Sequence, residues 1–210
     1  MLPFGKHKGK QITDVFLKDK KYIDWLVTTD WYNKKFPELT ELSNKLIKEY
    51  NENIVYNDYI IIYTDGACSK NGQIGAQCGI GIHFSEKNPI KLKDVSNRLN
   101  VEVATNNVAE LSAINTAINM VIDNNYTNYK IELYTDSRYS IDCVEKWYKM
   151  WVKKNNLEKK NIEIIKNIYD NIQNLRFEFK YIKAHTNLSD EHSMGNAKAD
   201  QLATNSLKKY

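Results

Sequence analysis

The sequence predicts an α/β protein, with a mixed five-stranded sheet flanked by helices and a small, mostly helical module in front of it. The first observation is the order of patterns after residue 58, where strand-like apolar runs alternate with helical periodicity. The second is that two of the strand-like runs end in a Thr-Asp pair, at Asp65 and Asp136. The third is a short polar segment that follows the helical patterns near residue 50. We therefore expect a module at 1–50, a linker at 51–58 and a larger domain at 59–210.

Composition limits the class of protein before any motif is considered. Of the 210 residues, 42% are hydrophobic and 27% are charged, which is typical of a globular protein in water. No apolar run approaches the roughly 20 residues that span a bilayer, and the N-terminus lacks the apolar core of a secretory signal. The three cysteines fit neither a disulfide framework nor a CxxC zinc site. We therefore expect an intracellular monomer with reduced thiols and no membrane contact, in the cytoplasm or, in a eukaryotic or viral setting, in the nucleus or a virus factory.

The predicted N-terminal module begins with a glycine turn at residues 4–10. This turn carries three lysines: Lys6, Lys8 and Lys10. Cations beside exposed backbone N–H groups could hold phosphates. Helical patterns follow at 22–26 and 39–47, and a module this small needs its aromatic residues for most of its burial. The alternative is a solvated turn that only stabilises a helical hairpin.

The segments of the larger domain follow in the order of an α/β fold. Five have the composition of strands: 59–63, 75–84, 91–102, 129–134 and 176–182. Four have the apolar periodicity of helices: 106–122, 137–151, 161–172 and 196–207. The first three strands are close enough in sequence to pair antiparallel through hairpins. Because a helix precedes the strand at 129–134, we expect that strand to run parallel to the first one through a right-handed crossover.

Four carboxylates are expected to meet at one edge of the sheet: Asp65, Glu110, Asp136 and Asp200. Carboxylates that are brought together repel one another and leave water only at a cost, so such a cluster usually implies a bound cation. Oxygen ligands suit Mg²⁺ or Mn²⁺, and two ions about 3.5–4 Å apart can clamp an in-line phosphoryl displacement, with Asp65 as the bridging ligand. Taken singly, each acid could instead cap a turn or a helix.

His185 stands directly after the last predicted strand and before a polar loop. An imidazole in that position could swing toward a scissile phosphate and shuttle a proton. The alternative is a capping or surface histidine, but the four acids nearby favour the catalytic interpretation.

The segment 146–166 combines cations with aromatic rings. It holds seven Lys against two Glu, together with Trp147, Tyr148 and Trp151. Such a mixture suits a surface that follows a polynucleotide backbone and stacks on its bases, and the net charge of +4 is compatible with that partner. The alternative is a solvated amphipathic helix whose tryptophans belong to the core.

These motifs, in this order and spacing, resemble those of the type 1 ribonuclease H family. They are Thr64-Asp65-Gly66, Thr105-Asn106-Asn107-x-x-Glu110, Tyr134-Thr-Asp136-Ser137, His185 and Gly195-Asn-x-x-Ala199-Asp200. The resemblance covers about residues 59–207. It implies a ribonuclease H-like fold and Mg²⁺-dependent cleavage of the RNA strand of an RNA/DNA hybrid, with 5′-phosphate and 3′-hydroxyl ends.

The resemblance also implies a substrate surface. The residues expected to contact the RNA minor groove and its 2′-hydroxyls are Cys68, Ser69, Asn71, Asn106 and Asn107. The expected channel for the DNA strand is formed by Tyr139, Trp147 and Trp151, with Thr105 and Asn161 near a DNA phosphate. One departure is the segment 151–161, which is shorter than the basic protrusion of some relatives, so we expect that protrusion to be trimmed.

The N-terminal module resembles the small C-terminal domain of exonuclease X-like proteins. The resemblance rests on Phe4-Gly5-Lys6-x-Lys8-Gly9-Lys10 and Tyr22-Ile-x-Trp25-Leu26. Eukaryotic-type ribonucleases H carry a different N-terminal domain that binds hybrids. We hypothesise that the present module does the same work by tethering the enzyme to its substrate.

Two other functions remain open. One is a DNA nuclease of the same fold superfamily, such as a resolvase or a transposase-like enzyme, although the Asn-rich helix start and the His185 loop argue against it. The other is an inactive protein that binds hybrids or another partner, although the four intact acids argue against that. Cleavage of a hybrid that is lost on Asp136→Asn would separate these interpretations.

Overall fold

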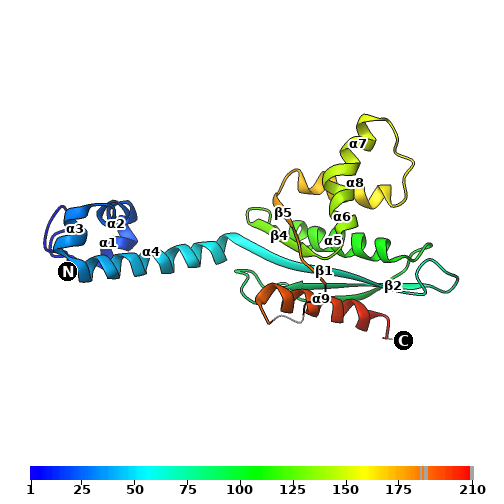
Figure 1. The fold of residues 1–210 in the computed structure, drawn as a ribbon, viewed down its shortest axis with the longest axis horizontal. Coiled ribbons are helices and arrows are strands. Elements are labelled where there is room, and N and C mark those ends of the chain that lie inside the picture. The colour runs from blue at the N-terminus through cyan, green and yellow to red at the C-terminus, as the bar shows by residue number, and fades with distance from the viewer. Residues whose placement is uncertain (185, 187–188, 209–210) are drawn as a thin grey trace. The chain divides into compact units, whose positions relative to one another are not determined.

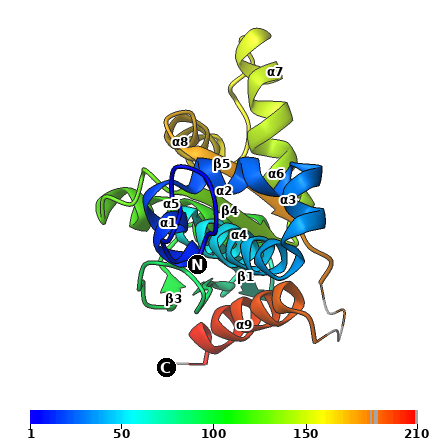
Figure 2. The same ribbon diagram turned by 90° about the vertical axis from the view of Figure 1, so that its left-hand side faces the viewer.

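The computed structural model describes residues 1–184, 186 and 189–208, and for residues 50–58 it describes the backbone alone. The chain divides into two compact units, Met1–Asn57 and Asp58–Tyr210. Figures 1 and 2 show the ribbon of each unit from two directions. Among the described residues, no helix combines the length and the apolarity that crossing a bilayer requires.

The first unit is helical, as predicted, with helices α1 (Ile12–Lys18), α2 (Lys20–Val27), α3 (Asp30–Lys35) and α4 (Pro37–Asp58). The predicted patterns correspond to α2 and α4, whereas α1 and α3 were not predicted. They enclose a small buried cluster: Leu2, Ile12, Val15, Phe16, Ile23, Leu26 and Tyr32. The ring of Phe4 packs on those of Trp31 and Phe36, with centroids 4.7 and 4.9 Å away. Most members of the buried cluster are nevertheless aliphatic, and Trp25 and Trp31 are exposed, so aromatic side chains share the burial in this unit and do not supply most of it as expected.

Helix α4 continues through residues 51–58, the segment that we expected to be a linker. Pro37 suits the first position of a helix, and no glycine or further proline occurs between it and Asp58 that would end the helix. The polar composition of this segment is therefore compatible with a helical backbone.

The second unit contains the predicted mixed sheet. Its strands are β1 (Tyr59–Ser69), β2 (Gln77–Phe84), β3 (Val95–Leu99), β4 (Lys130–Thr135) and β5 (Arg176–Tyr181). Their order across the five-stranded sheet is β3-β2-β1-β4-β5. Strand β2 is antiparallel to both β1 and β3, whereas β4 is parallel to β1 and to β5. The predicted hairpins and the parallel crossover are both present.

Helix α5 (Asn106–Asp123) covers one face of this sheet and α9 (Glu191–Ser206) covers the other (Figure 1). Because successive side chains of a strand point to opposite faces of the sheet, neighbouring residues of β1 contact different helices. Ile62 belongs to the core cluster that includes the apolar face of α5, whereas the ring of Tyr63 lies against Gly195 of α9. The central strands β1 and β2 are therefore buried between two helical layers, whereas the edge strands β3 and β5 stay partly exposed.

Glycines in β2 allow α9 to approach the sheet closely. A Cβ atom on Gly81 would collide with the backbone of α9 at Ala199 and Ala203. Both alanines are fully buried at this contact. The glycine-rich strand at 75–84 therefore holds the helix that carries Asp200.

The predicted helix at 137–151 is divided into α6 (Arg138–Asp142), a π-helical turn η1 (Cys143–Trp147) and α7 (Tyr148–Lys153). A π turn adds one residue to the helical repeat and is frequent at functional sites. Helix α8 (Ile162–Ile172) follows. Figure 1 shows α7 and the loop after it standing away from the sheet, so a protrusion is present although the segment is short.

Candidate active site

Three carboxylates lie together where β1, β4 and α5 meet. One oxygen of each of Asp65, Glu110 and Asp136 lies within 4.8 Å of the other two. The fourth predicted acid, Asp200 of α9, is close enough to Asp65 for its charge to raise the pKa of that carboxyl. The structure thus brings the four acids from four separate elements to one place.

Local structure explains how each of the first three acids reaches the cluster. A Cβ atom on Gly66 would collide with the backbone nitrogen of Glu110, so glycine is needed for β1 to touch the first turns of α5. The start of α5 is fixed because Thr105 Oγ1 accepts a hydrogen bond from the Val108 backbone N–H at 3.2 Å. Parallel pairing of β1 with β4 then brings Asp136 beside Asp65.

Burial and mutual repulsion act on the carboxylates of this cluster, as the pKa values of two of them show. Asp65 is 7% exposed, and burial, with the charges of Asp136 and Asp200, raises its pKa to about 7. Burial and the neighbouring acids raise the pKa of Glu110 well above its ordinary value. The Oε2 atom of Glu110 is buried and has no hydrogen-bond partner within the described part of the chain. A divalent cation that prefers oxygen ligands would neutralise this set, so the residues fit a metal site.

Asn196 has no predicted role in the site, but the structure places its side chain against the cluster. Its Nδ2 donates a hydrogen bond to Asp136 Oδ2 at 3.2 Å, and the side chain is 4% exposed. Asn196 precedes Asp200 by four residues on α9, so both side chains lie on one face of the helix. This spacing in the sequence indicates that Asn196 lies near Asp200, but it does not indicate the hydrogen bond with Asp136.

Most of the residues that we expect to contact the substrate line one cavity of about 580 Å³. Its lining includes Asn71, Thr105, Asn106, Asn107, Tyr139 and Asn161. Asn71 Oδ1 accepts a hydrogen bond from the Asn106 backbone N–H at 2.9 Å, which ties the β1–β2 turn to α5. Lys160, one of the seven lysines of the predicted cationic segment 146–166, also lines this cavity, although it was not singled out as a site residue. Amide groups beside a cation can bind a phosphate or a hydroxyl group of a polynucleotide.

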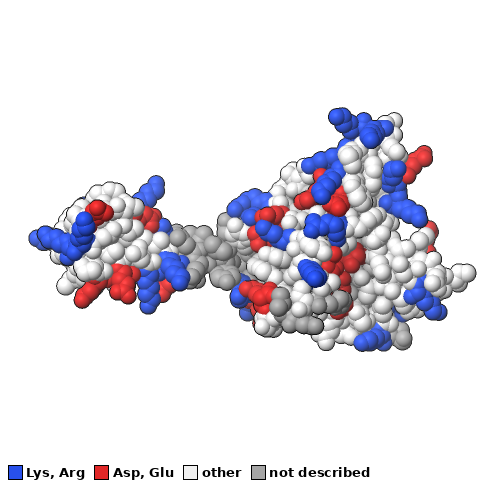
Figure 3. Space-filling view, in the orientation of Figure 1, with Lys and Arg blue, Asp and Glu red and all other residues white. Residues whose placement is uncertain are grey.

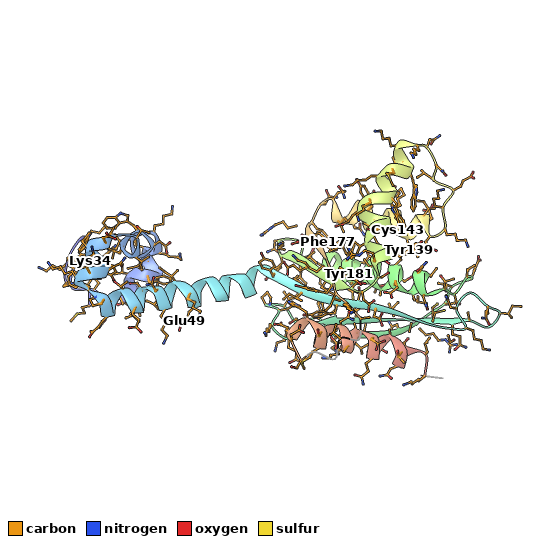
Figure 4. All side chains as sticks on the ribbon, in the orientation of Figure 1. Lys34, Glu49, Tyr139, Cys143, Phe177 and Tyr181 are labelled. Atoms are coloured by element: carbon orange, nitrogen blue, oxygen red, sulfur yellow. The ribbon has the colours of Figure 1, made fainter. Side chains whose placement is uncertain are left out.

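The three predicted channel aromatics form a row along α6, η1 and α7. The ring centroids of Tyr139 and Trp147 are 6.0 Å apart, and those of Trp147 and Trp151 are 6.2 Å apart. We call the protruding segment formed by α6, η1, α7 and the loop after α7 the α7 arm. Figure 4 places Tyr139 and Cys143 at the base of this arm, near the sheet. Both tryptophans also pack partly against the main core, so the structural and the surface interpretations of this segment apply together.

Positive charge gathers on the same arm. Figure 3 shows Lys and Arg over α7 and the loop beyond it, where the exposed lysines are Lys149, Lys153, Lys154 and Lys160. Aromatic rings and exposed cations on one protruding element are what a strand-binding surface requires.

The remaining predicted residues are placed as follows. Cys68 and Ser69 lie at the end of β1, at the turn into β2, and His185 lies outside the described residues. In the first unit, Lys6 Nζ forms an ion pair with Asp19 Oδ2 at 2.6 Å, whereas Lys8 and Lys10 are exposed. The three lysines of the turn are therefore not equivalent.

Comparison with known proteins gives two family matches. The family model described as RNase H matches residues 57–208, and the one described as Exodeoxyribonuclease X-like C-terminal matches residues 2–28. The chain is 37% identical over 145 residues to a probable ribonuclease H of Acanthamoeba polyphaga mimivirus, covering 66% of this chain and 62% of the relative. It is 36% identical over 162 residues to a ribonuclease H of Orientia tsutsugamushi (strain Boryong), covering 74% and 86%. The match to human ribonuclease H1, at 30% identity, covers 72% of this chain and about half (51%) of that protein.

Solved structures share the fold of the second unit. The solution structure of the PFV RNase H domain has a TM-score of 0.57 at 24% identity, covering 70% of this chain and 93% of that one. The structure of LC11-RNase H1, isolated from compost, has a TM-score of 0.54 at 22% identity, covering 72% and 97%. At these identities the likeness concerns the fold alone.

Proposed function

The chain belongs to the RNase H family, and we propose that it cleaves the RNA strand of RNA/DNA hybrids by metal-dependent hydrolysis. The observation that carries this proposal is the set of buried Asp65 with half-buried Glu110 and Asp136, whose oxygens lie within 4.8 Å of one another, together with an amide-lined cavity at the start of α5, the helix that carries Glu110. Together they provide a metal site and, next to it, polar groups that suit a polynucleotide.

Asp65, Glu110, Asp136 and Asp200 would hold Mg²⁺, as two ions, and Mn²⁺ would also be accepted. When bound, such ions make a water molecule nucleophilic at neutral pH and neutralise the charge on the leaving 3′ oxygen. The chain's own part is to hold the carboxylates in the correct orientation, which is the role we give to Asn196 on Asp136. We give His185 the role of moving a proton at the leaving group.

The hybrid would lie across the cavity and the α7 arm. Asn71, Asn106 and Asn107, with Cys68 and Ser69 of the turn, would contact the RNA minor groove and its 2′-hydroxyls. Thr105 and Asn161 would hold a DNA phosphate, with Lys160 beside them. The row of Tyr139, Trp147 and Trp151 would contact the DNA strand.

The ends of the products test this mechanism. Attack by water with a 3′-oxygen leaving group yields a 3′-hydroxyl and a 5′-phosphate, so poly(A) polymerase should extend the upstream RNA fragment without prior treatment. Polynucleotide kinase should label the downstream fragment only after phosphatase treatment. A 2′,3′-cyclic phosphate on the upstream fragment would instead indicate attack by the neighbouring 2′-hydroxyl and would contradict the proposal.

Replacing Asn196 by Ala is expected to lower kcat by about 10- to 100-fold, the usual effect of losing a partner that orients a metal ligand. The reason is the lost hydrogen bond to Asp136 Oδ2. Steady-state cleavage of a hybrid measures the effect, and Thr204→Ala, at an exposed position of the same helix, is the matched control. Equal kcat values for the two variants would show that Asn196 does not contribute to catalysis.

We also propose that the first unit binds nucleic acid. Asp19 holds both Lys6 and His7, at 2.6 and 2.9 Å, which fixes the glycine turn on the junction of α1 and α2. Lys8 and Lys10 project from that fixed turn and are available for phosphates. Trp25 is 52% exposed, and its ring lies 5.8 Å from that of Tyr22, so an aromatic surface accompanies the cations.

The double variant Lys8→Gln/Lys10→Gln is expected to raise KM for a long hybrid by about threefold to tenfold at low salt, with kcat unchanged. The matched control is Lys34→Gln/Lys35→Gln, which removes the same charge from α3 of the same unit (Lys34 is labelled in Figure 4). If both double variants raise KM equally, total charge rather than the glycine turn is responsible. If neither does, the docking proposal fails.

A further inference from the structure

Two thiols face each other across the first hairpin of the catalytic unit. Strands β1 and β2 pair antiparallel with Cys68 directly opposite Cys78. The two Sγ atoms lie 2.8 Å apart, and both residues are free cysteines. Cys78 is fully buried and Cys68 is half-buried. We propose that Cys68 and Cys78 form a thiol-oxidation site, which low-molecular-weight disulfides convert into an intramolecular disulfide bond.

The backbone geometry already suits this bond. Directly opposed residues of antiparallel strands have Cα atoms about 4.5–5.5 Å apart, and disulfides form when this distance is about 4.4–6.8 Å. No movement of either strand is therefore needed. Cys143, the third thiol, lies in η1 and packs in a different cluster of the core. Oxidation should therefore join Cys68 to Cys78 and leave Cys143 as a free thiol.

The reaction is a pair of thiol–disulfide exchanges. The Cys68 thiolate attacks one sulfur of oxidised glutathione, so that a mixed disulfide forms and one glutathione thiolate leaves. Cys78 then attacks the Cys68 sulfur, displaces the second glutathione as a thiolate, and gives up its proton to it or to solvent. In total two protein thiols are oxidised and one glutathione disulfide is reduced to two thiols. Cys68 is the attacking residue because it is the accessible one, and burial raises the pKa of Cys78 to about 12.

Oxidation would act on the substrate surface and not on the carboxylates. Cys78 Sγ–H donates a hydrogen bond to the Thr105 carbonyl oxygen at 3.3 Å, and Thr105 both caps α5 and lines the cavity. The disulfide removes that donor. It also draws the Cys68 side chain, which we place at the RNA minor groove, onto Cys78. We expect the oxidised protein to bind hybrid more weakly while its kcat is unchanged.

Thiol counting on the full chain tests the bond itself. The native protein is equilibrated with oxidised glutathione, desalted and unfolded, and its free thiols are titrated. The reduced chain has three thiols, and we expect one after oxidation, with Cys68 linked to Cys78 in the peptide map. Cys143→Ala should still lose two thiols. Cys78→Ala, whose methyl group suits the surrounding Ala104 and Ala109, should form no intramolecular bond. Three free thiols in the oxidised wild type, or a bond that includes Cys143, would overturn the proposal.

The effect on binding rests on the proposed function and has its own readout. Oxidised wild type should show a KM for hybrid about threefold to tenfold higher than the reduced protein, the size expected for one lost hydrogen bond. Dithiothreitol should reverse the rise, whereas the KM of Cys78→Ala, which lacks the thiol donor throughout, should not change on treatment with oxidised glutathione. An unchanged KM with the bond formed would contradict the effect on substrate. Absence of all cleavage by the reduced protein would refute the proposed function, while the thiol count would still decide the bond.

Discussion

Asp65→Asn is expected to reduce cleavage of hybrid RNA by about 10³-fold or more, because the change removes a charge that the metal ions require. Asn has the same shape, so the fold and the contacts of the cavity should be retained. Single-turnover cleavage in Mg²⁺ measures the loss, and filter binding in Ca²⁺ measures the affinity for hybrid. Asp170→Asn, at a half-exposed ion pair on α8, is the matched control and should retain full activity. Cleavage by Asp65→Asn within tenfold of the wild type would contradict the assigned role.

The same substitution is expected to stabilise the protein when no divalent cation is present. The pKa of Asp65 is about 7 in the folded state, against an ordinary value of 3.8. Between these two pH values the folded protein keeps a proton that the unfolded chain has lost, so stability falls as pH rises through this range.

The pH dependence makes that expectation measurable. At pH 8 in EDTA, Asp65→Asn should be more stable than the wild type by on the order of 2–4 kcal/mol. At pH 4 the difference should shrink to less than about 1 kcal/mol, because the folded wild type keeps the Asp65 proton and the unfolded chain also holds it in part. Mg²⁺ should raise Tm of the wild type more than that of the variant. If Asp65→Asn is less stable than the wild type at pH 8, the charge of Asp65 does not destabilise the folded protein and the expectation is wrong.

Gly81→Ala is expected to lower the free energy of unfolding by about 3 kcal/mol or more, at the upper end of the cost of overpacking. The added methyl group meets backbone atoms of Ala199 and Ala203, which cannot move as a side-chain tip can. Helix α9 must shift, and Asp200 with it, so activity should fall as well. Urea unfolding followed by circular dichroism measures the loss. Gln77→Ala, at an exposed position of the same strand, should change stability by less than about 0.5 kcal/mol.

The sheet and its carboxylates could be predicted because each depends on short sequence patterns. An apolar run that ends in Thr-Asp indicates a strand that delivers an acid at its end, and this occurs at both Asp65 and Asp136. The helix between the two strands then requires a parallel crossover, which the pairing of β1 with β4 confirms. Local pattern and chain connectivity together were enough for this part.

Other features depend on contacts between residues far apart in sequence. Gly66 and Gly81 are needed because of helices that pack on them, and the sequence shows the glycines but not those helices. The hydrogen bond from Asn196 to Asp136 and the entry of Lys160 into the cavity belong to the same class. Lys6 is an example of a predicted role that a distant contact changes. The sequence predicts that it binds phosphates, but in the structure it forms an ion pair with Asp19.

The most direct test of the central claim is cleavage of four end-labelled substrates by the full chain in Mg²⁺: RNA/DNA hybrid, double-stranded RNA, double-stranded DNA and single-stranded RNA. We expect the RNA strand of the hybrid to be cut and the other substrates to remain intact, because the site combines a metal centre with groups that distinguish a 2′-hydroxyl. EDTA should abolish the reaction. Cleavage of double-stranded DNA, cleavage that persists in EDTA, or binding of hybrid without any cleavage would contradict the claim.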